Sequence, residues 1–127
     1  MTASHIARVE YTDNFEANLA EIEQFWQLNH RAIEYDHLLE RLLHTVVPSL
    51  EQYPELGKQF LSQDDGRADP LLVLITTSSH LDKLRELVFD NYVLLYLFDT
   101  SAGAKSPSIQ LIAIKHHKQL AFNFTTH

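Results

Sequence analysis

The sequence predicts an α+β domain, because its helical and strand-like stretches occupy separate parts of the chain. The last third contains three strand-like runs in succession, at residues 84–89, 92–98 and 108–115. Two stretches with apolar residues at helical intervals come before them, and a short alternating run precedes both. We therefore expect an N-terminal strand, an antiparallel helical hairpin and a C-terminal antiparallel β-meander, with the helices covering one side of the sheet.

The N-terminal strand is expected at residues 5–11, where apolar and polar side chains alternate. Thr12 or Asp13 is expected to cap the first helix, and Glu16 follows Asp13 at the spacing of a capping box. This helix should end near residues 29–30. Its apolar side chains recur at helical intervals, at Phe15, Leu19, Ile22 and Trp26.

A second helix is expected after a short connection, which implies that it packs antiparallel to the first. Its apolar stripe consists of Tyr35, Leu39, Leu42, Val46 and Leu50. Pro48 lies inside this pattern and has no backbone N–H, so it is expected to kink the helix or to mark its last turns. Residues 53–57, Tyr-Pro-Glu-Leu-Gly, contain helix breakers and end the hairpin.

Residues 61–82 form an irregular connection in this interpretation. Asp69 and Pro70 have the order of a helix cap followed by a first helical proline. A short helix is therefore predicted over residues 71–77, although these residue types favour strands.

The C-terminal strands are separated by two connections of different length. Asp90 and Asn91 both tolerate positive φ, which predicts a tight hairpin turn before residue 92. Residues 92–98 are apolar on both faces, which predicts a central strand. A long connection at residues 99–107 leads to the last strand, after which residues 120–124 should pack back on the domain.

The composition is that of a globular domain. Of 127 residues, 45 % are hydrophobic and 21 % are charged, which argues against disorder. The chain has no cysteine, which excludes disulfides and thiolate metal sites and favours a reducing compartment. The first residues lack a signal-peptide pattern, and the apolar runs are too short to span a bilayer. We expect one cytoplasmic domain over residues 1–127, with no membrane partner.

Charge is unevenly distributed along the chain. The formal net charge is −7; residues 1–69 carry 5 basic and 13 acidic side chains, whereas residues 70–127 carry 5 and 4. From Thr100 onward there is no acidic side chain, while lysines and histidines cluster near residue 116. This pattern fits either an anion-tolerant end of the molecule or a tail that is merely poor in acidic residues, and the two readings have equal weight.

With its elements in this order, the chain resembles the toxins of bacterial type II toxin–antitoxin modules, the RelE/ParE superfamily known also from plasmid stabilisation. The matching segments are Val9-Glu10-Tyr11, Tyr53-Pro54-Glu55-Leu56-Gly57, Leu84-Arg85-Glu86-Leu87, Asn91-Tyr92-Val93-Leu94-Leu95-Tyr96 and Ile112-Ala113-Ile114-Lys115-His116-His117-Lys118-Gln119. Each segment alone is a weak signal, and their order makes the resemblance more specific. Residues 61–82 look like an insertion relative to compact members of the family.

The resemblance implies a small toxin that a cognate antitoxin neutralises and that contacts DNA only through that antitoxin. RelE-like members cut mRNA in the ribosome, whereas ParE-like members inhibit DNA gyrase by binding to it. Two features favour the ParE-like branch: the helices are acidic rather than basic, and His117 and Asn123 occur where RelE has an arginine and a tyrosine. The alternatives are a ribosome-dependent mRNA endoribonuclease and a non-toxic relative that keeps antitoxin binding. A homodimer formed through exposed apolar surface stays open.

The candidate site residues differ between the two branches. For partner binding they are Arg85, Lys115, His116, His117, Lys118, Gln119, Phe122 and Phe124. For the nuclease alternative they are Arg85, which would stabilise charge on a phosphate, His116 or His117, which would transfer protons, and Tyr92.

Each candidate also has a structural interpretation. Arg85 suits an ordinary ion pair, Tyr92 suits a core residue with a satisfied hydroxyl, and adjacent histidines on a strand point to opposite faces unless the strand has ended. No cofactor is expected. No metal site is expected either, because neighbouring strand residues chelate poorly and the segment carries no acidic residue.

Overall fold

The computed structural model describes residues 7–59, 83–99, 107–119 and 122–123. The short helix predicted after Asp69 and the candidate residue Phe124 lie outside these ranges. The described part is an α+β domain with a helical layer packed on a five-stranded mixed sheet. In chain order its elements are β1 (Arg8–Tyr11), α1 (Asp13–Leu28), α2 (Ala32–Arg41), a π-helical turn η1 (Leu42–Val46), α3 (Val47–Gln52), β2 (Lys58–Gln59), β3 (Leu84–Phe89), β4 (Tyr92–Asp99) and β5 (Ser108–His116).

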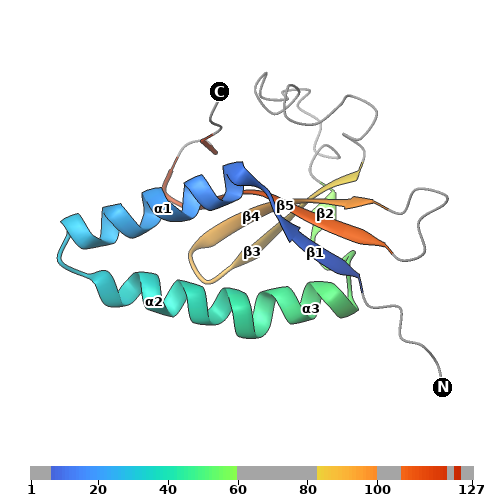
Figure 1. Cartoon of the computed structure of the whole chain (residues 1–127), viewed down its shortest axis with the longest axis horizontal. Coiled ribbons are helices and arrows are strands. Elements are labelled where there is room, and N and C mark those ends of the chain that lie inside the picture. The colour runs from blue at the N-terminus through green and yellow to red at the C-terminus, as the bar shows by residue number, and fades with distance from the viewer. Residues whose placement is uncertain (1–6, 60–82, 100–106, 120–121, 124–127) are drawn as a thin grey trace.

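The sheet has the strand order β1-β5-β4-β3-β2. Strands β3, β4 and β5 are antiparallel neighbours, whereas β1 joins β5 in parallel and β2 adds a short antiparallel edge beside β3. Figure 1 shows α1 running antiparallel to the helix formed by α2 and α3, with the strands beside them. The three C-terminal strands thus form an antiparallel meander, and β1 and β2 extend the sheet at its two edges. Alternation in the sequence identifies a strand but not its neighbour, and the two residues of β2 are too few to alternate visibly.

The boundaries of α1 agree with the caps expected from the sequence. The Thr12 hydroxyl accepts a hydrogen bond from the N–H of Phe15 (3.2 Å), so Thr12 is the N-cap. Helix α1 ends at Leu28 with Asn29 as its C-cap. His30 adopts a φ of 59°, a left-handed conformation that turns the chain towards α2.

The second helix runs without a break from α2 through η1 into α3. The residues at both joints, Leu42 and Val47, have right-handed helical dihedral angles. The N–H of Val47 bonds to the carbonyl of Leu42, five residues earlier, which widens the helix directly before Pro48. Because Pro48 lacks an N–H and its ring crowds the preceding turn, the π-helical turn lets the helix continue to residue 52.

The core lies on both faces of β4. The larger cluster joins Phe15, Ile22, Leu38, Leu42 and Leu50 of the helices to Tyr92, Leu94, Tyr96, Leu111 and Ile114 of the sheet. A smaller cluster on the other face contains Leu84, Leu95, Leu97, Ile112 and Ala113, with Phe122 packed against it. Residues 92–97 are all buried, and β4 has neighbours on both sides, so the prediction of a central strand is confirmed.

Two buried asparagines of α1 complete the hydrogen bonding of β5. Strand β1 pairs with β5 only as far as Leu111, so the backbone beyond it needs other partners. The side-chain NH2 of Asn14 donates to the backbone carbonyl of Ile112 (3.0 Å). The side-chain carbonyl of Asn18 accepts from the backbone N–H of Ile114 (3.0 Å). Both side-chain amides also donate to the carbonyl of Asn123, which ties the segment after β5 to α1.

Replacing Asn18 should destabilise the fold. In Asn18→Ala the buried N–H of Ile114 loses its acceptor, so we expect the free energy of unfolding to fall by about 1–3 kcal/mol. Urea denaturation followed by circular dichroism measures this. Gln24→Ala, on the exposed side of α1, is the control and should change stability by less than about 0.5 kcal/mol. Equal effects of the two substitutions would contradict this role of Asn18.

Candidate functional site

The candidate site lies where β5 ends, against the turn between α1 and α2 and the β3–β4 hairpin. His116 is the last residue of β5 and pairs with Tyr92, the first residue of β4. Residues 117–119 then turn away from the sheet. The N–H of His117 donates to the carbonyl of Asn91 (2.7 Å), so the hairpin holds the start of this turn. Asp90 has a φ of 52°, which agrees with the tight turn expected at residues 90–91.

His116 is fixed by its own turn. Its Nδ1 accepts a hydrogen bond from the backbone N–H of Lys118 (3.2 Å), and its backbone N–H donates to the side-chain oxygen of Gln119 (3.0 Å). Burial lowers the pKa of His116, and the charges of His117, Lys118 and Lys115 lower it further. Because Nδ1 is an acceptor here, the neutral imidazole carries its proton on Nε2 and has no free lone pair for a substrate.

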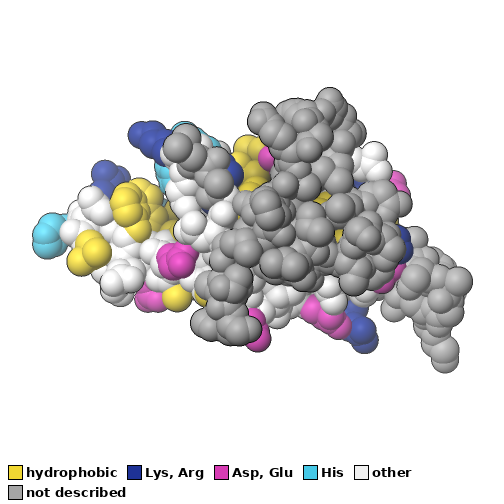
Figure 2. All heavy atoms as spheres, turned by 90° about the horizontal axis from the view of Figure 1, so that it is seen from above, with side chains coloured by type: hydrophobic (Ala, Val, Ile, Leu, Met, Phe, Trp, Pro, Cys, Tyr) yellow, Lys and Arg dark blue, Asp and Glu magenta, His cyan; other side chains and the backbone are white. Residues whose placement is uncertain are grey.

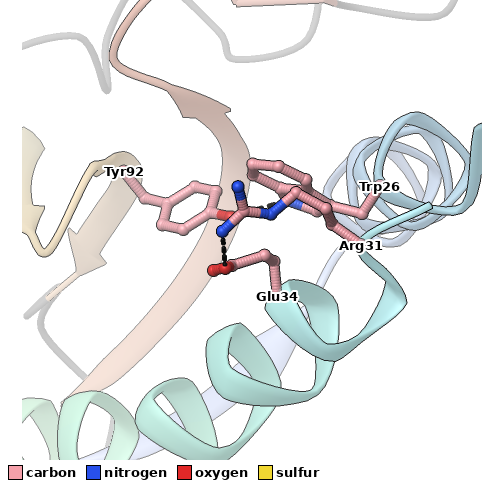
Figure 3. A network of polar contacts seen from close by, with 4 residues as sticks. All are labelled: Trp26, Arg31, Glu34 and Tyr92. Carbon is pink, nitrogen blue, oxygen red and sulfur yellow. Dashed lines mark hydrogen bonds and ion pairs between the residues drawn. The ribbon is translucent and has the colours of Figure 1, made fainter. Parts of the chain in front are cut away.

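The His116 ring packs against Trp26 of α1 and Tyr92 of β4. Figure 3 shows these two residues together with Arg31 and Glu34. The Trp26 indole N–H donates to the Tyr92 hydroxyl (3.0 Å), and both rings meet the His116 ring edge to face. Arg31 lies over the Trp26 ring at 5.9 Å and forms an ion pair with Glu34 (2.7 Å). Burial raises the pKa of Tyr92. Tyr92 is therefore a buried residue with a satisfied hydroxyl.

The two adjacent histidines lie together rather than on opposite faces. Their rings are 4.7 Å apart and nearly perpendicular. Strand β5 ends at His116, so alternation no longer applies to His117, whose side chain is exposed. The geometry thus places one partly buried and one exposed imidazole at the same end of the sheet.

Arg85 lies elsewhere on the sheet. It pairs with Tyr96, four residues along β4 from Tyr92, which corresponds to about 13 Å along the strand. Its guanidinium donates to the carbonyl oxygens of Gly57 and Glu55. The structure does not bring Arg85 to the histidines, and the expectation that it lies beside the segment from Lys115 onward does not agree with this register.

Arg85 belongs to a compact turn that joins the helical hairpin to the sheet. The Tyr96 hydroxyl accepts from the N–H of Gly57 (2.8 Å) and donates to the carbonyl of Pro54 (2.7 Å). A Cβ at Gly57 would lie 2.6 Å from the carbonyl oxygen of Glu86, so only glycine fits. Burial raises the pKa of Tyr96.

The remaining predicted contact residues are divided between the two faces of the sheet. Lys115 points away from the helices, lies over the Phe122 ring at 5.5 Å and donates to the carbonyl of Gln119 (3.1 Å). Phe122 packs on the smaller core cluster. Lys118 is exposed and lies on the helical side with His116 and His117. The predicted segment is therefore continuous in sequence but not a single surface.

Two pockets adjoin His116. One, of about 490 Å³, lies between α1 and the segment after β5, and its apolar walls are Ile22, Phe25, Trp26 and Ile114. The other, of about 810 Å³, is more polar, and its walls include Arg31, Glu34, His37, Tyr92, His117 and Lys118. Trp26, His116 and Lys118 line both.

Sequence reasoning missed the contribution of the helices to this site. Trp26 was expected only in the core stripe, and neither Arg31 nor His37 was singled out. The periodicity that identifies a helix does not show which of its polar side chains meet a distant turn. The available signal was that Trp26 ends the apolar stripe of the first helix, three residues before the turn at residues 29–30 and close in sequence to Arg31.

No protein-family model matches the sequence, and no curated protein does. Within the residues described above, no three side chains of histidine or acidic residues converge to hold a metal ion. In the same ranges no helix has the length and apolar character needed to cross a membrane.

Arg85 is expected to act on stability. Arg85→Ala removes the donors to two carbonyl oxygens of residues 55–57, so the free energy of unfolding should fall by about 1–2 kcal/mol. Arg8→Ala is the matched control, because its exposed ion pair with Glu10 contributes about 0–1 kcal/mol. Thermal denaturation compares the two. If Arg85→Ala is as stable as the wild type, its role in holding this turn is wrong.

His116 is expected to titrate below its ordinary pKa of 6.5. The folded chain then binds fewer protons than the unfolded chain, so this group stabilises the fold above that value, and the contribution is lost as the pH falls through the lowered pKa. NMR titration of the imidazole signals measures the midpoint. Lys118→Gln removes a nearby charge and should raise the midpoint, whereas Lys83→Gln, directly before β3, should not. A midpoint above 6.5 would contradict this environment.

Proposed function

We propose that this chain is the toxin of a type II toxin–antitoxin module, of the ParE-like kind, which binds and inhibits DNA gyrase and is neutralised by a cognate antitoxin. The observation that carries the proposal is that segments on which the family resemblance rests meet in space. Residues 53–57 contact Arg85 and Tyr96, and residues 116–117 contact Asn91 and Tyr92. These contacts join segments far apart in the chain and so support the resemblance as more than a set of local matches.

The finer proposal for the fold is a RelE/ParE-like arrangement. In it, the first strand and the helical hairpin precede the three antiparallel strands that carry the site. The order of elements around β3, β4 and β5 supports this arrangement. The segment at residues 61–82 would be the insertion relative to compact members.

The site geometry favours binding over RNA cleavage. Cleavage by the 2′-hydroxyl group requires a base, an acid and a cation within reach of one phosphate. Arg85 is bonded to the turn at residues 55–57, and the acceptor nitrogen of His116 is occupied by the N–H of Lys118. Arg85 and the histidines proposed for RNA cleavage therefore do not lie together in one site.

Exposed apolar side chains near the basic turn at residues 116–118 support a binding surface. Phe25, Leu28 and Ile33, near the turn between α1 and α2, are 53 %, 71 % and 56 % exposed. Figure 2 shows hydrophobic side chains beside Lys, Arg and His side chains at the end of the molecule where α1 finishes. Apolar patches of this kind next to charged groups are typical of protein interfaces. In the absence of an antitoxin, the same patch is where a second copy would pair.

Induced expression in bacteria tests the proposal. We expect growth arrest that coexpressed antitoxin relieves, together with DNA breaks in cells and loss of supercoiling activity when purified gyrase is mixed with the chain. Lys118→Glu should weaken inhibition at least tenfold, because it reverses the charge of an exposed side chain of the site. Lys58→Glu, equally exposed on β2, is the matched control and should retain inhibition.

Two results would overturn this function. Cleavage of mRNA at codon boundaries, with gyrase unaffected, would assign the chain to the RelE-like branch. Unimpaired growth and full gyrase activity would leave a non-toxic relative that only binds antitoxin.

A further inference from the structure

The two pockets at the candidate site share one wall and differ in character. The rings of Trp26 and His116, with centroids 6.2 Å apart, form that wall. On one side lies the pocket of about 490 Å³ with apolar walls, and on the other lies the polar pocket of about 810 Å³. Lys118 reaches the rim of both. A ligand that binds across these two rings therefore contacts an apolar pocket on one side and a basic pocket on the other.

The apolar pocket, defined by Ile22, Phe25, Trp26 and Ile114, is suited to a large aliphatic or aromatic side chain. Its floor is rigid, because the Trp26 indole is bonded to Tyr92 and Ile114 is held by Asn18. Phe25 is half exposed and packs edge to face on Trp26, with ring centroids 5.0 Å apart. A preformed aromatic pocket is the usual location of an interface anchor.

The polar pocket carries an excess of cationic and imidazole groups. Its two carboxylates are already paired, Glu34 with Arg31 (2.7 Å) and Asp90 with Arg41 (3.1 Å). Both charges are thus partly neutralised. Glu21, the carboxylate of the apolar pocket, accepts a hydrogen bond from the Asn123 side chain (3.1 Å), and the exposed rings of His37 and His117 add donors. A carboxylate of a ligand can be satisfied there, whereas a further cation would be repelled.

We propose that this two-pocket surface receives an acidic segment of a partner protein, with an apolar side chain in the first pocket and a carboxylate in the second. This inference rests on the proposed function and deepens it, because it assigns the chemistry that the partner presents. The charge of the rest of the chain supports an acidic occupant. The chain has a net charge of −7, whereas residues 100–127 contain no acidic side chain, so an acidic segment is repelled by much of the surface and directed to the basic turn that follows β5.

Selection from a random peptide library displayed on phage, against the purified full chain, tests the inference. We expect the enriched peptides to carry Asp or Glu within a few residues of Leu, Ile, Phe or Trp. For one enriched peptide, synthesised with a fluorescent label, Lys118→Glu should weaken binding at least tenfold. The matched control Lys58→Glu should change it less than twofold. Affinity should fall as the salt concentration rises.

A second pair of variants tests the apolar pocket. Phe25→Ser removes one exposed wall and should weaken the same peptide at least fivefold. Leu43→Ser, at a comparably exposed position in η1, is the matched control and should leave the affinity unchanged. Circular dichroism spectra confirm that each variant is folded before binding is measured.

Several outcomes would overturn the inference. They are enriched peptides without acidic residues, binding that is unaffected by Lys118→Glu, and displacement of the peptide by a short single-stranded RNA that binds more tightly. Self-association of the chain that Lys118→Glu abolishes would assign the surface to a second copy instead. Because binding is measured on the purified chain, its failure is separable from that of the proposed function. If the chain arrests growth but no acidic peptide is enriched, this inference alone is wrong. If acidic peptides are enriched but the chain is not toxic, the proposed toxin function alone is wrong.

Discussion

The position of α1 on the sheet depends on how Asn14 and Asn18 bond to the edge of β5. Four residues of an α-helix rise about 6 Å, which is close to the rise of about 6.6 Å for two residues of a strand. The two asparagines are four residues apart, and their partners Ile112 and Ile114 are two residues apart. The side chains of a helix therefore match alternate backbone groups of a strand. This match fixes the register of α1 on the sheet at buried positions, where an error would leave polar groups unpaired.

The same register builds the candidate site. Two turns beyond Asn18, α1 places Trp26 against Tyr92, and two residues beyond Ile114, β5 ends at His116. The rings of Trp26, Tyr92 and His116 meet because the hydrogen bonds of Asn14 and Asn18 fix how α1 is aligned along β5. A surface assembled in this way is rigid on its floor, while the side chains around its rim stay exposed. Rigidity of the floor lowers the ordering cost of binding, and it places charged groups at fixed distances from an apolar pocket.

Much of the fold could be predicted from local patterns. The cap at Thr12, the end of α1, the turn at residues 90–91 and the buried strand at residues 92–97 follow from cap chemistry and hydrophobic periodicity. The parallel placement of β1 and the existence of β2 did not, because strand pairing is decided between distant segments. Only the part of the site at the end of β5 could be predicted from the sequence. The cluster near residue 116 is visible in sequence, whereas the bond from the Lys118 N–H to His116 and the separation of Arg85 depend on where β5 ends and on register.

The turn that holds Gly57 against Tyr96 has a consequence for the segment that follows it. Gln59 of β2 is paired with Arg85 of β3, and residues 60–82 connect these two strands in the sequence. The two ends of this connection thus lie on neighbouring strands. The entropic cost of bringing the two ends of such a connection together grows only slowly with its length. A change in the length of this connection is therefore expected to cost little closure entropy, and the junction of Gln59 and Arg85 is suited to the attachment of a fluorescent reporter.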